Sequence, residues 1–201
     1  MEAIDTTVAS RPAEPRWQHL TGGTAIWIFM TLEVATFGMF FLWFAWSWGG
    51  RADVYAESQA LLDVGSGLLG TALLLVGSWA AYQGVLANAA DRSRATAGWF
   101  GAAAAAGVLF SLNKLLEYAA HADHGITLST NGFWFAYLFL TKLHLLHVIG
   151  GVGALLVIGT RAARGRYGAR NALTVEAVAA YWHLVDVIWI FLFPLLYVVS
   201  P

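Results

Sequence analysis

The sequence predicts an all-α integral membrane protein, built as a bundle of five transmembrane helices. Of its 201 residues, 59% are hydrophobic and only 11% are charged, whereas a soluble domain carries about 25% charged residues. The ten Trp residues fit a membrane protein as well, because Trp collects at membrane interfaces. Five apolar segments reach the length of about 20 residues that one crossing requires. They lie at roughly 24–46, 61–87, 97–119, 133–159 and 175–199.

The first 23 residues precede these segments and are expected to form a solvated tail. Glu2, Asp5 and Glu14 come before any apolar run, which does not fit a cleaved signal peptide. We expect residues 24–201 to form a single transmembrane domain.

Positive charge in the connecting segments predicts the orientation. The tail and the loops 88–96 and 160–174 hold two, two and four Arg residues, and with five spans these three segments share one side. The loops predicted on the other side hold only Arg51. Because Lys and Arg in short loops favour the cytoplasm, we expect a cytoplasmic N-terminus and an external C-terminus.

A glycine motif in the second segment is interpreted as helix packing. Gly65-Ser-Gly-Leu-Leu-Gly70 matches the dinucleotide-binding pattern GxGxxG. That pattern requires a preceding strand, and none is expected here. Small residues that let two helices approach closely explain the motif better.

Ionisable residues in the spans fall into two predicted layers. At about 1.5 Å per residue, Glu33 and Asp186 lie roughly 15 Å from the cytoplasmic ends, close to the midplane. His183, His147 and His144 lie at roughly 12, 18 and 22 Å on the same count.

An outer layer holds two amines and a carboxylate. Lys114 and Lys142 fall at about 25 Å, with Glu117 just beyond. Lys stems at that depth can extend to the interface.

The midplane layer admits three interpretations. Its carboxylates can lock helix packing while neutral or paired, can serve a proton-related or lipid-headgroup role, or can take part in catalysis or metal binding. His144 or His147 opposite His183 would suit axial haem ligation. The sequence lacks the Glu-x-x-His pairs of di-iron bundles and any recognisable catalytic motif, so we expect no metal site and no catalytic residue.

The composition excludes several kinds of metal centre and gives no sign of a nucleic-acid partner. The chain has no cysteine, which excludes thiolate zinc sites, iron–sulfur clusters and a cysteine-ligated copper centre. No basic patch suggests nucleic acid.

Four motifs, in order along the chain, resemble subunit III of the haem-copper respiratory oxidases. The segment Leu32–Phe37 is similar to its Ser-Glu-Val-x-x-Phe helix, and Lys114–Tyr118 to its Gln-x-x-Glu-Tyr, with Lys in place of Gln. Thr141–Gly151 resembles its Thr-Gly-x-His-x-x-His-Val-x-x-Gly, and Tyr181–Trp189 its Tyr-Trp-His-Phe-Val-Asp-x-x-Trp.

The resemblance implies a short, five-helix bacterial form in the cytoplasmic membrane. Such a subunit carries no haem or copper of its own, since these belong to its partners. It would bind subunit I and also subunit II, hold phospholipid, and support proton uptake and active-site durability. Glu33 would be the family's buried carboxylate, with His144, His147, His183 and Asp186 lining the bundle around it.

The expected function is therefore a non-catalytic accessory subunit of a cytochrome c or quinol oxidase, an oxygen-reducing complex of aerobic respiration that translocates protons. Two alternatives stay open. Lys114 and the ending Phe191–Tyr197 resemble the branch associated with nitric oxide reductases. From another class, the chain could be an independent membrane cytochrome that uses its histidines.

Overall fold

The computed structural model describes residues 22–168 and 172–199, and all regular structure there is helical. Five long helices agree with the five predicted spans, and each is long and apolar enough to cross a membrane. The protein is thus a multi-pass membrane protein. Almost all of the predicted tail lies outside the described residues. The helices are α1 Thr24–Trp48, α2 Ala52–Gln59, α3 Val64–Ala89, α4 Ser93–Asp123, α5 Gly132–Ala163 and α6 Ala172–Tyr197.

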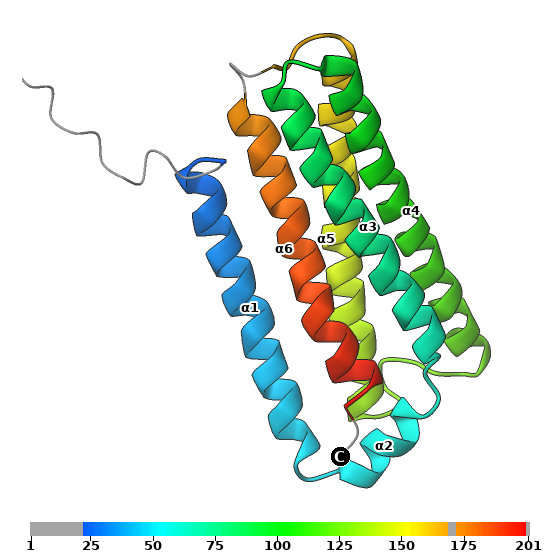
Figure 1. Cartoon of the computed structure of the whole chain (residues 1–201). Coiled ribbons are helices and arrows are strands. Elements are labelled where there is room, and N and C mark those ends of the chain that lie inside the picture. The colour runs from blue at the N-terminus through cyan, green and yellow to red at the C-terminus, as the bar shows by residue number, and fades with distance from the viewer. Residues whose placement is uncertain (1–21, 169–171, 200–201) are drawn as a thin grey trace, which may run out of the picture.

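Helices α3 to α6 form a four-helix core, and α1 lies at its edge (Figure 1). Helix α4 packs between α3 and α5, and α6 contacts both α3 and α5. Helix α1 packs mainly against α6 and, less, against α5, and just two of its residues, Phe37 and Phe44, are buried. Most of its apolar surface faces outward.

Helix α4 extends beyond the predicted span. His121 and Asp123, expected in a loop, belong to its last turn. The helix ends at Asp123 and is followed by Gly125, whose φ of 73° is accessible to glycine. The amide of Ile126 donates to the carbonyl of His121 at 3.0 Å. This cap fits the usual αL helix ending.

The short helix α2 was not expected within the loop after the first span. Its Tyr55 and Ser58 are buried. Gln59 Nε2 donates to the carbonyls of Leu196 and Val199, both at 3.1 Å. Helix α2 therefore closes the end of the bundle at which α6 terminates (Figure 1).

The connections separate into two ends. The start of α1, the α3–α4 turn, the end of α5 and the start of α6 gather at one end, and α2, the α4–α5 loop and the end of α6 at the other (Figure 1). The count of Arg residues on each side of the membrane assumed the same division of the loops. The cytoplasmic assignment of the Arg-rich end stays a prediction.

Glycines inside the helices permit close packing. A Cβ at Gly67 would lie 2.5 Å from Cε2 of Phe193, and one at Gly107 would lie 2.5 Å from Cγ2 of Val152 and 2.6 Å from Cη2 of Trp182. Gly67 belongs to the GxGxxG stretch, which lies in α3 after a turn and not after a strand. The packing interpretation of that stretch is confirmed.

We predict that Gly107→Ala lowers the free energy of unfolding by about 1–3 kcal/mol, the usual effect of overpacking a core. Gly101→Ala in the same helix is the matched control, because its Cβ would meet no atom within 4 Å. Thermal unfolding of the detergent-purified protein measures both. Equal stability of the two variants would show that the helices at Gly107 have room to separate.

Candidate functional site

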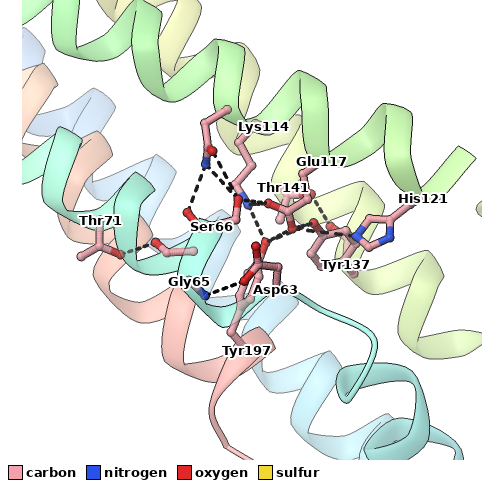
Figure 2. A network of polar contacts seen from close by, with 12 residues as sticks. Asp63, Gly65, Ser66, Thr71, Lys114, Glu117, His121, Tyr137, Thr141 and Tyr197 are labelled. Carbon is pink, nitrogen blue, oxygen red and sulfur yellow. Dashed lines mark hydrogen bonds and ion pairs between the residues drawn. The ribbon is translucent and has the colours of Figure 1, made fainter.

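A buried ionic cluster joins four helices near the α2 end of the core (Figure 2). Lys114 and Glu117 lie three residues apart on α4, and Lys114 Nζ donates to Glu117 Oε2 at 2.8 Å. Tyr197 of α6 donates to Oε1 at 2.5 Å, Tyr137 of α5 donates to the same oxygen, and Ser66 of α3 donates to Oε2 at 3.0 Å. The carboxylate thus accepts hydrogen bonds from all four core helices.

Lys114 is enclosed by this cluster and does not extend to the interface as expected. Its exposed fraction is 0%. Its Nζ lies 4.8 Å from the ring centroids of both Trp189 and Tyr197, within the range of a cation–π contact. Lys142 differs: it is exposed, and its Nζ lies 5.7 Å from the ring of Tyr118. The predicted outer layer therefore divides into a buried pair and a separate surface Lys.

Asn113 and His121 extend the cluster along α4. Asn113 Nδ2 donates to both the carbonyl and Oγ of Ser66 at 3.1 Å, which ties α4 to α3. His121 Nε2 lies 3.9 Å from Glu117 Oε1, and its ring contacts Trp134 edge-on. Asn113, Lys114, Glu117 and His121 share one face, because residues three or four apart are neighbours on a helix.

A second contact between ionisable side chains links α1 to α5 within the predicted midplane layer. His147 Nε2 lies 3.1 Å from Glu33 Oε2, with side-chain exposures of 16% and 18%. His147 Nδ1 lies 2.8 Å from the carbonyl of Leu143, and Phe37 packs edge-on against the imidazole. This pair secures an otherwise loosely attached helix.

The other three residues predicted around Glu33 have different surroundings. His183 Nδ1 is 2.6 Å from Ser78 Oγ of α3. His144 is fully buried between Phe110 and Trp189. Asp186 is 3% exposed, and neither His144 nor Asp186 hydrogen-bonds through its side chain to a described residue. The structure brings only His147 to Glu33 and places the remaining three at separate contacts in the core.

The contacts of these ionisable side chains hold helices together, and they do not form a recognisable catalytic arrangement. In the buried ionic cluster, the carboxylate, the amine and the two phenols are hydrogen-bonded to one another. Within the described ranges 22–168 and 172–199, no group of three or more His, Asp or Glu side chains is placed to hold a metal ion. These features define a polytopic helical membrane protein in which the contacts of Glu117 and of Glu33 join helices.

Comparison with known proteins identifies the family. The family model described as cytochrome c oxidase subunit III matches residues 23–200. The chain therefore belongs to the subunit III family of the haem-copper oxidases, and the resemblance found in the sequence is confirmed.

Relatives from several organisms agree. Cytochrome c oxidase subunit 3 of Corynebacterium diphtheriae is 28% identical over 175 residues, 86% of this chain and 85% of the relative. The probable quinol oxidase subunit 3 of Staphylococcus haemolyticus is 25% identical, covering 96% of this chain and 94% of the relative. The haem-copper oxidase subunit I+III of Aeropyrum pernix is 30% identical over 88% of this chain, which matches 22% of that longer protein.

We predict that Lys114→Met destabilises the protein by about 3–5 kcal/mol, because it leaves the Glu117 carboxylate buried without its cation. Lys114→Met combined with Glu117→Gln should recover most of that loss. A double-mutant cycle on thermal unfolding measures the coupling. If the two single effects simply add, Lys114 and Glu117 are not an interacting buried pair.

Proposed function

We propose that the chain is a non-catalytic accessory subunit of an oxygen-reducing terminal oxidase in the bacterial cytoplasmic membrane. It docks to subunit I and also contacts subunit II, and it supports proton uptake and phospholipid binding without a redox centre of its own. Haem and copper belong to the partner subunits. The family match over residues 23–200 is the observation that carries this proposal.

Association with subunit I is supported by the relative from Aeropyrum pernix. The name of that protein joins subunits I and III in one polypeptide, and a fusion keeps the two parts together. Helix α1 supplies a surface for such a contact, since its outward residues Leu32, Met39 and Leu42 are all more than half exposed. The same face would otherwise meet lipid.

The histidine contacts favour an accessory role over an independent cytochrome. Axial ligation brings imidazoles from facing helices to one iron. Here His147 meets Glu33, His183 meets Ser78, and His144 packs against Trp189. Each ring is engaged by a different neighbour.

The relatives favour an oxidase over a nitric oxide reductase. The three described above carry the names of a cytochrome c oxidase, a quinol oxidase and a haem-copper oxidase. Lys114, which suggested the other branch, has a structural role in the buried cluster. Its presence is therefore not specific to a substrate.

Glu33 is the carboxylate we assign to the proton- or lipid-related role. Of the two predicted midplane carboxylates it is the more exposed, since its side chain is 18% exposed whereas Asp186 is 3% exposed. It lies where the peripheral helix α1 meets α5. A carboxylate at that position can exchange a proton with a partner subunit, or contact a lipid headgroup, more readily than the enclosed Asp186.

We predict that the tagged chain purifies with a haem-containing subunit and that its deletion lowers proton uptake or shortens the enzyme's working life without removing the haem spectrum. Optical spectra and oxygen consumption of the two preparations measure this. Loss of the haem signal while the other subunits persist would contradict the accessory role. A Soret band in the isolated chain would support the independent cytochrome instead.

We predict that Glu33→Ala leaves assembly intact, because it removes one charge-assisted contact worth about 1.5–3 kcal/mol at the bundle edge. Labelling of the subunit by an apolar carbodiimide should disappear, and the number of turnovers before inactivation should fall. Glu33→Gln, which keeps the side-chain shape, is the control and should behave as Glu33→Ala does. A variant that fails to assemble would favour a purely packing role.

A further inference from the structure

A cavity of about 850 Å³ opens between the start of α3 and the end of α4, beside the buried ionic cluster. Its size suits an organic molecule. The function proposed above makes no use of it. Its polar lining consists of Asp63, Ser66, Asn113, Glu117, His121 and His124.

The polar lining is organised by depth. Asp63 and His124 are exposed and mark the mouth, whereas Glu117 is 8% exposed and lies at the floor. Glu117 is held there by Lys114, Tyr137 and Tyr197 on its far side. The Glu117 side chain is therefore fixed in position at the floor of the cavity.

The charge of this lining is negative. Two carboxylates face the cavity, and no Lys or Arg is among the described residues that line it. Lys114 balances Glu117 from behind, but Asp63 forms no ion pair with any described residue. Low-dielectric walls strengthen the attraction of a cation to such a cleft.

The rest of the lining is apolar, with Leu61, Leu69 and Leu116 among its residues. A metal ion would want a compact set of ligands, and the described residues offer no such set. An ammonium group suits dispersed oxygen acceptors better, and an attached alkyl body suits the leucines. We propose that this cavity binds an amphiphilic amine, with the ammonium at Asp63 near the mouth and the alkyl body against the leucines.

Thiol labelling tests the charge preference. The chain has no cysteine of its own, so a single introduced one reports on its own surroundings. Ala120→Cys lies in the lining, and Ala119→Cys, also exposed but outside the lining, is the control. In the purified complex, a trimethylammonium thiosulfonate should outpace its sulfonate counterpart at position 120 by about tenfold relative to position 119.

Asp63→Asn in the Ala120→Cys background should remove most of that preference. The fold is expected to persist, because Asp63 caps α3 through a side-chain oxygen that accepts from Gly65, and Asn caps helices equally well. A preference equal to that at position 119, or one unchanged by Asp63→Asn, would overturn the proposal.

Protection experiments then identify the ligand's source. Decylamine should slow labelling at position 120 several-fold, whereas decanoate should not. Vesicles of phosphatidylglycerol with and without phosphatidylethanolamine form the second arm. Slowing by phosphatidylethanolamine assigns the site to a lipid headgroup, and slowing by decylamine alone assigns it to a soluble amine. Slowing by neither, or equally by decanoate, would refute amine binding.

Discussion

The Glu117 carboxylate is the interaction on which the core depends. It accepts hydrogen bonds from Lys114, Tyr137, Tyr197 and Ser66, and so links α4 to α5, α6 and α3. Lipid provides no hydrogen bonds to replace such contacts. A charge placed here has to be satisfied within the protein, and doing so fixes how the four helices meet.

Small residues position the helices around this carboxylate, in addition to its charge. Gly107 of α4 leaves room for the ring of Trp182 from α6, and Gly67 of α3 leaves room for the ring of Phe193, also from α6. Close approach is what brings short side chains such as Ser66 within reach of Glu117. Helix α1 lies outside this arrangement. It is held by the contact between Glu33 and His147 and by aromatic packing of residues such as Phe40 and Phe44 against α5, and its outer face is left available for a partner.

Hydropathy and motif order were enough to predict the five spans and the family, because long apolar segments and ordered motifs are strong local signals. Helix α2 was missed, since it is short and polar. The spacing of Lys114 and Glu117 could have revealed their pairing. Their partners Tyr137 and Tyr197 could not be predicted, because they come from distant parts of the chain. The same holds for Ser78 of α3, whose hydroxyl lies 2.6 Å from His183 Nδ1 on α6.

An experimental density map of the intact oxidase complex, at a resolution that shows side chains, tests the central claim most directly. We expect such a map to show Lys114 and Glu117 enclosed together with Tyr137 and Tyr197. We also expect this chain to contact a haem-bearing subunit while supplying no ligand to its iron. A map in which Lys114 or Glu117 points into lipid, or in which an imidazole of this chain ligates iron, would contradict the central claim.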